Sequence, residues 1–356
     1  MTEFERFLLD SKVKFLKDFD LQYQTYFKTG GKADFFIMPT NKEEMATVIK
    51  RLNNINKKFK VIGATTNLVL FDGMSYPVII STKLLTGVAQ AGNAIDVECG
   101  YALESLVRVC LINGLEGNEG LEGVPGTIGG AIFMNAGAYG YSISDCLIHV
   151  DCIDGKGDLI RFNNDECTFS YRESIFKNNN DLVVVGAQFR FESGERKEIA
   201  KKIEIFHIAR HIYQEWAYPN LGSMVSLNKD IYGEIFNEGR IKYTYYFLKL
   251  LLRNPLTKFF MRKRPNTQVF NWLLKRHIIN NKKVLFMNKY RYSFSGKSAN
   301  ILINDGTYTA NDYVDHLLDI SGLCSGREMV ENEFLYNEES LSKELKSKLK
   351  LLKKSQ

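Results

Sequence analysis

Residues 120–140 read GLEGVPGTIGGAIFMNAGAYG and hold the densest run of glycines in the chain. A flexible linker would combine glycine with serine and other polar residues, whereas these glycines lie among apolar and small residues. Glycine adopts positive φ and has no Cβ to hold a ligand away from the main chain. Successive N–H groups exposed in such turns form a concave site for phosphate oxygens. The stretch therefore predicts a cradle for a nucleotide cofactor.

The alternative interpretation is a glycine-rich bend without a ligand, which suits a single glycine pair better than a run of this length. The segments GVPGTIGGA (residues 123–131) and MNAGAYG (residues 134–140) resemble the flavin-binding segment of the bacterial UDP-N-acetylenolpyruvoylglucosamine reductases, the MurB family. A match of this length is far more specific than an isolated GxGxxG. The resemblance implies that FAD contacts seven residues of the run: Gly123, Gly126, Thr127, Gly129, Gly130, Asn135 and Gly137.

The first part of the chain has the strand–helix–strand pattern that presents main-chain donors to a pyrophosphate. A helical segment is expected at 1–20, then a strand that ends at Pro39, a helix from the N-cap Asn41 to about Asn54, and strands at 60–62 and 78–80. The turn after residue 62 resembles the pyrophosphate turn of the family. The resemblance implies FAD contacts at Gly63, Ala64, Thr65, Thr66, Asn67 and Leu68. No histidine precedes His149, so FAD is expected to bind non-covalently.

Periodicity and turn residues predict further elements along the chain. Helices are expected at 103–113, 197–210 and 309–319, with Gly114 at the end of the first. A hairpin is expected at 149–157, a strand and turn at 295–306, and strands at 183–190 and 329–335. These elements place the motifs that follow on loops and strand ends.

The segment YRES, residues 171–174, resembles the Tyr-Arg-Asp/Glu-Ser motif of the family, whose arginine faces the substrate carboxylate. The resemblance implies that Arg172 is catalytic and that Tyr171 contacts the substrate. Arginine suits this task because its planar guanidinium binds a carboxylate through two hydrogen bonds and keeps its charge. A surface ion pair between Arg172 and Glu173 is the alternative. The short spacing after Lys177 resembles the compact form of the family, which lacks an extra tyrosine-bearing loop.

The resemblance implies two further catalytic residues. The proton donor of the family is a serine or cysteine after glycine, which corresponds to Ser223, and the second glutamate of its Leu-Glu-x-Glu-Val strand corresponds to Glu333. A plain turn and an exposed strand acid are the alternatives. The family continues with Lys-Asn-Pro, which holds the nucleotide sugar, where this chain has SLNK (residues 226–229). Asn228 and Lys229 are candidate replacements with a small shift of register, and Lys297 is a candidate substrate contact.

Length and composition are those of a globular protein of several subdomains, with 356 residues, 45% hydrophobic and 25% charged. The expected division is 1–84 and 85–197 for two FAD-binding subdomains, 198–335 for a substrate-binding domain and 336–356 for a basic helical tail. No apolar run reaches the roughly 18 residues of a membrane span, and residues 1–6 lack a signal-peptide pattern. The six cysteines show no CxxC pair or metal spacing, so a cytoplasmic protein with reduced thiols and no metal is expected.

The segment 231–288 is an expansion that the resemblance does not cover. No acidic residue lies between Glu238 and Asp305, and lysines and arginines alternate there with tyrosines, phenylalanines and a tryptophan. Three interpretations remain: helices with a solvated basic face, which is favoured, a peripheral contact with an anionic membrane, and nucleic-acid binding, which no accompanying motif supports. No nucleic-acid partner is expected.

These features together predict an α+β protein, in which a two-subdomain FAD-binding fold (PCMH/vanillyl-alcohol-oxidase-like) precedes a C-terminal α+β substrate domain. The resemblance implies an NADPH-consuming flavoenzyme that reduces UDP-N-acetylglucosamine enolpyruvate to UDP-N-acetylmuramate for peptidoglycan synthesis. In the family, NADPH reduces the flavin, which then transfers hydride to the enolpyruvyl β-carbon. The alternatives are a related reductase of another nucleotide sugar in capsule or O-antigen synthesis, and a non-catalytic interaction protein.

Overall fold

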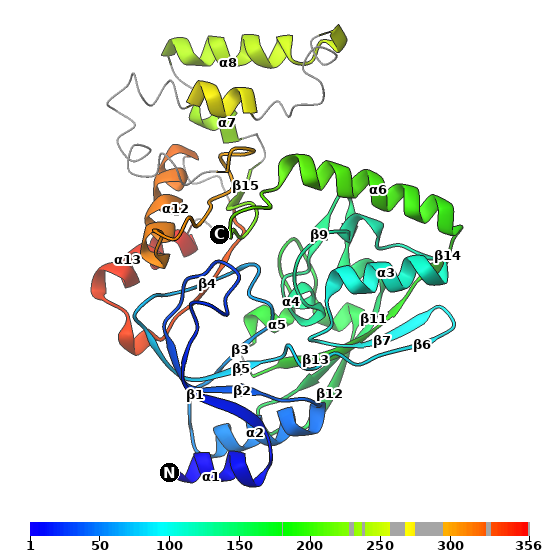
Figure 1. Cartoon of the computed structure of the whole chain (residues 1–356), viewed down its shortest axis with the longest axis vertical. Coiled ribbons are helices and arrows are strands. Elements are labelled where there is room, and N and C mark those ends of the chain that lie inside the picture. Colours follow the sequence, from blue (N-terminus) through cyan, green and yellow to red (C-terminus); the bar gives the residue numbers. More distant parts are fainter. Residues whose placement is uncertain are drawn as a thin grey trace. The chain divides into compact units, whose positions relative to one another are not determined.

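The computed structural model describes residues 1–179, 181–227, 231–236, 239–256, 268–274, 295–324 and 329–354. The chain folds into two compact units, and its elements are labelled in Figure 1. Unit 1 contains Met1–Leu21, Lys32–Thr65 and Ser75–Ile208, and unit 2 contains Gln22–Gly31, Thr66–Met74 and Ala209–Gln356. Helix α6 (Arg196–Tyr213) begins in unit 1 and ends in unit 2.

The first sheet of unit 1 has four strands in the order β1-β2-β5-β3. Its strands are β1 (Lys14–Asp20), β2 (Lys32–Met38), β3 (Lys60–Ile62) and β5 (Ser75–Ser81). Strand β1 is antiparallel to β2, and the other two pairs are parallel. Helices α1 (Glu3–Asp10) and α2 (Lys42–Asn54) lie on one face of this sheet (Figure 1), where their apolar side chains form a common core with those of β2 and β5.

Several local predictions in this part are confirmed. Helix α2 begins after its N-cap Asn41, whose side chain accepts a hydrogen bond from the Glu44 N–H at 2.8 Å, and it ends at Asn54. Strand β2 ends directly before Pro39, and the strands predicted at 60–62 and 78–80 are β3 and the centre of β5. Each of these elements carries its own start or stop signal in the sequence.

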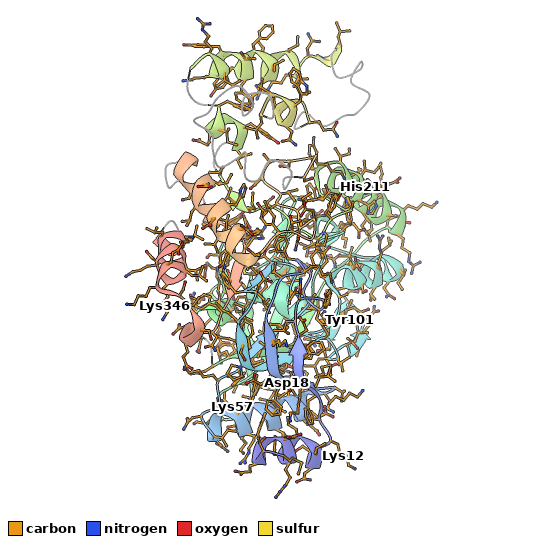
Figure 2. The ribbon with its side chains drawn as sticks, turned by 60° about the vertical axis from the view of Figure 1, so that its left-hand side comes forward. Lys12, Asp18, Lys57, Tyr101, His211 and Lys346 are labelled. Carbon is orange, nitrogen blue, oxygen red and sulfur yellow. The ribbon has the colours of Figure 1, made fainter. Side chains whose placement is uncertain are left out.

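The prediction of a helix over residues 1–20 is wrong beyond Asp10. Lys12, labelled in Figure 2, has a φ of 57°, a left-handed conformation that turns the chain away from the helix. Strand β1 follows and pairs with β2. Phe15 and Phe19 are four residues apart, a spacing that puts two side chains on one face in a helix and in a strand alike. Pairing with a distant strand decides between the two.

The second sheet of unit 1 has five antiparallel strands in the order β12-β11-β13-β7-β6. The strands are β6 (Val88–Ala91), β7 (Ala94–Glu98), β11 (Leu147–Ile153), β12 (Leu159–Asn163) and β13 (Val183–Arg190). The predicted hairpin at 149–157 is the β11–β12 pair, and the predicted strand at 183–190 is β13. Both are confirmed.

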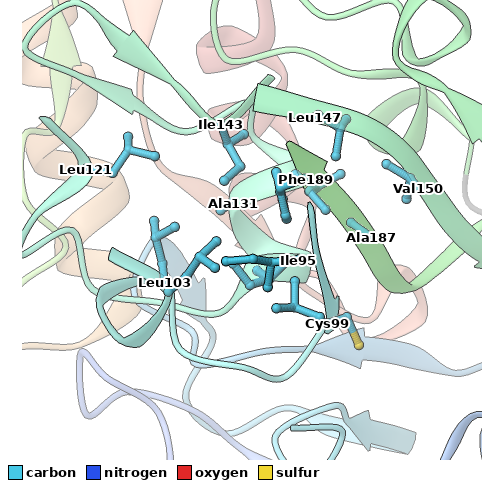
Figure 3. Close-up of a cluster of buried hydrophobic side chains, with 14 of the residues drawn as sticks. Ile95, Cys99, Leu103, Leu121, Ala131, Ile143, Leu147, Val150, Ala187 and Phe189 are labelled. Atoms are coloured by element: carbon cyan, nitrogen blue, oxygen red, sulfur yellow. The ribbon is translucent and has the colours of Figure 1, made fainter. Parts of the chain in front are cut away.

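Helix α3 (Leu103–Asn113) packs its apolar stripe into the core of this sheet (Figure 3). Ile95 of β7, Leu103 of α3 and Phe189 of β13 are all buried in that core. The helix ends at Gly114, which has a φ of 65°, as glycine at a left-handed C-terminal position allows. The predicted helix and its end are confirmed.

Short elements complete unit 1 between and after these strands. They are β8 (Leu115–Glu116), η1 (Glu119–Leu121), α4 (Ile128–Phe133), β9 (Gly137–Ala138), β10 (Tyr141–Ser142), η2 (Ile143–Cys146), η3 (Asn164–Cys167), α5 (Ile175–Asn178) and β14 (Glu192–Ser193). The glycine-rich run at 120–140 therefore folds as η1, α4 and β9.

Unit 2 contains two pairs of short strands and several helices. Strand β15 (Val225–Ser226) is antiparallel to β16 (Met329–Val330), and β4 (Leu68–Leu70) is parallel to β17 (Glu333–Leu335). Its helical elements include α7 (Ile231–Ile235), α8 (Gly239–Leu251), α12 (Ala310–Cys324), η4 (Glu338–Ser340) and α13 (Lys343–Lys354). The helix predicted in the tail is α13, which packs on α12 and forms an ion pair from Lys348 Nζ to Asp315 at 2.7 Å.

Two strand predictions in unit 2 are wrong in part, although the helices predicted at 197–210 and 309–319 are confirmed as α6 and α12. The described residues 295–306 form no strand, because Leu302 and Ile303 form only isolated bridges, the second of them to Asn220. The chain turns back there, because the Ser295 N–H donates to the Ile301 carbonyl at 2.9 Å. The strand predicted at 329–335 is two strands, since its partner changes from β15 to β4.

Candidate functional site

The glycine-rich run in unit 1 leads into α4, whose first N–H groups bond within the protein. Ile128 donates to the Tyr101 carbonyl at 2.9 Å, and Gly129 donates to the Cys99 carbonyl at 2.8 Å. These bonds fasten the start of α4 to the segment that follows β7. Because both donors already have acceptors in the chain, a phosphate at this loop would need N–H groups from its other residues.

Three glycines of the run are required by close packing: Gly120, Gly129 and Gly137. A Cβ on Gly120 would lie 2.3 Å from the Tyr141 ring and 2.7 Å from the Ala138 carbonyl oxygen. A Cβ on Gly129 would lie 2.9 Å from Cys99 Cβ. A Cβ on Gly137 would lie 2.9 Å from the Tyr141 carbonyl oxygen. These glycines allow segments of the protein to approach one another, so they serve the fold whether or not a ligand is bound.

Gly130 differs from its neighbours. It is exposed, and the nearest atom to a Cβ placed on it is Thr127 Oγ1 at 3.6 Å, an ordinary van der Waals distance. The protein itself therefore does not require glycine at this position. A ligand that lies against α4 would require it, which is the behaviour expected of a residue on a cofactor cradle.

The predicted pyrophosphate turn begins in unit 1 beside the same loop. A Cβ on Gly63 would lie 2.5 Å from Thr127 Oγ1, so these two predicted FAD contacts lie together. Thr65 has a φ of 60° and Asn135 a φ of 40°, and Gly126 has a φ of 135°. Left-handed non-glycine residues cost about 1–3 kcal/mol and gather at functional sites. Turns of this kind with small residues fit a phosphate-bearing cofactor.

Arg172 lies against the end of the glycine-rich run in unit 1. Its Nη2 donates to the Gly137 carbonyl at 3.3 Å, its guanidinium lies 5.2 Å from the centre of the Tyr171 ring, and its φ is 57°. Asn135 Nδ2 donates to the Ser170 carbonyl at 2.9 Å. The structure thus brings the YRES segment and the predicted cofactor residues Asn135 and Gly137 together.

The alternative for Arg172 was an ion pair with its neighbour Glu173. The Glu173 carboxylate lies 2.9 Å from Lys177 Nζ instead. Lys177 Nζ also donates to the Arg172 carbonyl oxygen at 3.3 Å. Lys177 therefore balances the charge of Glu173 and holds the main chain at Arg172.

The segments that carry Ser223 and Glu333 are far apart in the sequence and are bonded to each other in unit 2. Ser223 precedes β15, and the Glu331 N–H donates to the Met224 carbonyl at 2.9 Å beside the β15–β16 pair. The Glu333 N–H donates to the Asn67 carbonyl at 2.9 Å, and Glu333 pairs with Leu68. These main-chain bonds therefore join the segment that follows Ser223, the segment that contains Glu333 and the second half of the pyrophosphate turn.

Asn332, which the sequence interpretation missed, fastens these three segments. Its Nδ2 donates to Asn67 Oδ1 at 2.8 Å and to the Leu221 carbonyl at 3.3 Å, and its Oδ1 accepts from the Tyr313 hydroxyl. Asn67 Nδ2 in turn donates to the Glu331 carbonyl at 2.8 Å. Burial raises the pKa of Tyr313, so its hydroxyl keeps the proton that it donates. The only signal in the sequence was that Asn332, a polar residue, lies in the middle of the strand expected at 329–335.

Replacing Asn332 with leucine keeps a similar volume and removes these bonds. We expect the free energy of unfolding to fall by about 1–3 kcal/mol, because buried polar partners on Tyr313 and Leu221 lose their hydrogen bonds. Chemical denaturation measures this loss. The control is Asn311→Leu, which changes an exposed asparagine of α12, and an equal loss in that variant would contradict the assignment.

The three predicted substrate contacts have different outcomes. Tyr171 is exposed beside Arg172. The Nζ of Lys297 donates to the His211 carbonyl at 2.7 Å, in the last turn of α6. His211 is labelled in Figure 2. The C-terminal end of a helix carries a partial negative charge, and this charge attracts the ammonium group of Lys297. Asn228 lies outside the described residues, as does Lys229.

A neighbouring carboxylate supports the Lys297 segment. Glu215 accepts from the Ser295 hydroxyl at 2.7 Å, and the Ser295 hydroxyl also accepts from the Lys297 N–H at 3.1 Å. Burial alone would raise the pKa of Glu215, but hydrogen bonds from the Ala217 N–H and Ser295 lower it further than burial raises it. Glu215 is thus held as a carboxylate that orders this loop.

Comparisons with known proteins support an FAD-binding fold. A family model described as an FAD binding domain matches residues 33–163. A UDP-N-acetylenolpyruvoylglucosamine reductase 2 of Bacillus cereus is 37% identical over 204 residues, which are 57% of this chain and 67% of that protein. The UDP-N-acetylenolpyruvoylglucosamine reductase of Carboxydothermus hydrogenoformans is 40% identical over 210 residues, 59% of this chain and 69% of the relative.

A solved structure supports the fold over nearly the whole chain. The UDP-N-acetylenolpyruvylglucosamine reductase (MurB) of Thermus caldophilus superposes with a TM-score of 0.61 at 18% identity, over 91% of this chain and 99% of that one. The predicted fold class, a PCMH-like FAD-binding fold followed by a further α+β domain, is confirmed.

Two kinds of feature are absent from the described residues. Among the helices of those residues, none combines the length and the apolar character that crossing a bilayer requires. No group of three or more histidine, cysteine, aspartate or glutamate side chains in the described part of the chain is arranged to bind a metal ion.

Proposed function

This chain belongs to the UDP-N-acetylenolpyruvoylglucosamine reductase (MurB) family, and we propose on that basis that it reduces UDP-N-acetylglucosamine enolpyruvate to UDP-N-acetylmuramate. The proposed reaction uses FAD and NADPH and is a step of peptidoglycan precursor synthesis. It would take place in the cytoplasm. The observation that supports the proposal is the set of hydrogen bonds in unit 2 that joins the segments carrying Ser223 and Glu333 to the turn at Asn67.

The residues of unit 1 fit the phosphates of FAD. Gly63 and Thr127 lie together, Gly123 and Gly126 have positive φ, and the protein has room for a Cβ at Gly130 of α4. These residues would hold the cofactor non-covalently. When bound, FAD supplies the redox chemistry, because it takes electrons from NADPH and passes them to the enolpyruvyl double bond.

Three side chains meet the remaining chemical needs. Arg172 would bind the substrate carboxylate, since a guanidinium offers two parallel donors and a permanent charge. Ser223 would give the proton that the α-carbon requires, and Glu333 would stabilise the charge that develops beside it or relay protons. A serine is a weak acid, so its proton transfer needs a polarising neighbour.

The flavin spectrum tests this function. The purified protein should be yellow, lose its absorbance when NADPH is added without oxygen, and regain it when UDP-N-acetylglucosamine enolpyruvate follows. Bleaching without recovery would favour the second candidate, a reductase of another nucleotide sugar, which the replacement of Lys-Asn-Pro by SLNK after Ser223 supports. A protein that takes up no FAD would contradict both and favour an interaction protein.

Nucleotide-sugar substrate and NADPH are therefore the proposed small-molecule partners. A peripheral contact of the basic segment with an anionic membrane is a separate proposal, which is argued below from the exposed residues of helix α8.

A further inference from the structure

Helix α8 of unit 2 has an exposed apolar face on its outer side. Tyr243, Phe247 and Leu250 are 76%, 65% and 71% exposed, and Tyr246 is 51% exposed. The four positions repeat with the spacing that puts side chains on one face of a helix. We call Tyr243, Tyr246, Phe247 and Leu250 the α8 face.

The opposite side of the same helix is packed. Tyr245 is fully buried, with ring centres 5.1 Å from Phe270 and 5.7 Å from Phe236, and Leu252 is buried as well. Figure 2 shows side chains standing on the side of α8 that is turned away from α7. A helix packed on one side normally presents polar residues on the other, and α8 presents large apolar residues instead. Exposed apolar patches of this kind mark interaction surfaces.

The charged residues of α8 and of the described turn that follows it are all positive. Arg240, Lys242 and Arg253 are exposed beside it, and the sequence has no aspartate or glutamate from residue 239 to residue 304. A partner for this surface must therefore combine apolar material with negative charge. A symmetric contact with a second copy would place the same cations opposite one another, without an acid of this segment to pair them.

We propose that the α8 face docks peripherally on an anionic phospholipid bilayer. Aromatic and leucine side chains enter the boundary between headgroups and acyl chains, while the flanking cations contact lipid phosphates. Proteins that bind single-stranded nucleic acid stack aromatic side chains on the bases, and a leucine cannot stack in this way. The exposed Leu250 therefore favours a lipid partner over a nucleic acid. The proposal does not depend on which nucleotide sugar the enzyme reduces.

Co-sedimentation of the full chain with vesicles tests the proposal. The protein should bind vesicles of phosphatidylcholine with phosphatidylglycerol, bind phosphatidylcholine alone much more weakly, and leave the anionic vesicles as salt is raised. Phe247→Ser combined with Leu250→Ser should lower the binding by about tenfold, because affinity scales with the apolar area inserted.

A matched control is Ile112→Ser combined with Leu159→Ser, which removes two exposed apolar side chains from unit 1 and should leave vesicle binding unchanged. The melting temperature verifies that both double variants fold. The proposal fails if the wild-type protein ignores anionic vesicles or binds both vesicle types equally. It also fails if the α8 variant instead abolishes a dimer in gel filtration or the binding of single-stranded RNA.

Discussion

Replacing Ser223 with alanine should leave reduction of the bound flavin by NADPH intact and lower turnover of the enolpyruvyl substrate by about 10²–10⁴-fold, the range that general acid catalysis contributes. The main chain at this site is held without the serine side chain, because the Met224 N–H donates to the Asn300 carbonyl at 2.9 Å and the Val225 N–H to Asn300 Oδ1 at 3.1 Å. The hydroxyl can therefore be removed with little disturbance. Stopped-flow absorbance separates the two half-reactions, since flavin bleaching reports the first and its recovery reports the second.

Two further variants make this result specific. Ser223→Cys should retain much of the activity, because the family uses serine or cysteine at this position. Ser226→Ala changes another partly buried serine three residues further on, in strand β15, and should not slow the second half-reaction to a comparable extent. Normal recovery of the flavin in Ser223→Ala would remove Ser223 from the mechanism. Loss of both half-reactions together would instead indicate damage to the fold.

Elements with a start and a stop signal within a few residues could be predicted from the sequence. Helix α2 has Asn41 as its cap, and α3 has Gly114 as its left-handed end. The glycine-rich run could be identified for a different reason, because so many small residues lie close together in the sequence. Its separate roles were not predictable, because whether Gly129 meets Cys99 or a ligand depends on a segment about thirty residues away.

Features that depend on distant partners were missed. The apolar spacing in β1 suits a helix as well as a strand, and only the pairing with β2 makes this segment a strand. The two strands β16 and β17 looked continuous, and the change of partner between them follows from Asn332, which bonds to Asn67 265 positions away. A single sequence carries no local signal for a bond of that length. The proposed catalytic residues share this property: a motif could suggest Ser223 and Glu333, but the main-chain bonds that join their segments are tertiary.

Gly130→Ala should weaken FAD binding while leaving the fold intact. A Cβ at this position meets nothing in the protein closer than 3.6 Å, and alanine is the better helix former by up to about 1 kcal/mol. The apoprotein should therefore melt at the same temperature or slightly higher. If the cofactor lies against α4, the added methyl enters a packed contact, which costs about 1–3 kcal/mol. The dissociation constant of FAD should then rise by about tenfold to hundredfold, as measured by fluorescence titration of the apoprotein.

The neighbouring glycine provides the contrast that gives this result its meaning. In Gly129→Ala the new Cβ would lie 2.9 Å from Cys99 Cβ and 3.2 Å from the Cys99 carbonyl oxygen, so both the melting temperature and FAD binding should fall. A variant that loses the cofactor without losing stability can only have changed the surface on which the cofactor lies. Unchanged FAD affinity in Gly130→Ala would mean that the flavin does not contact α4. The glycine-rich run would then have to be explained by the packing of Gly120, Gly129 and Gly137.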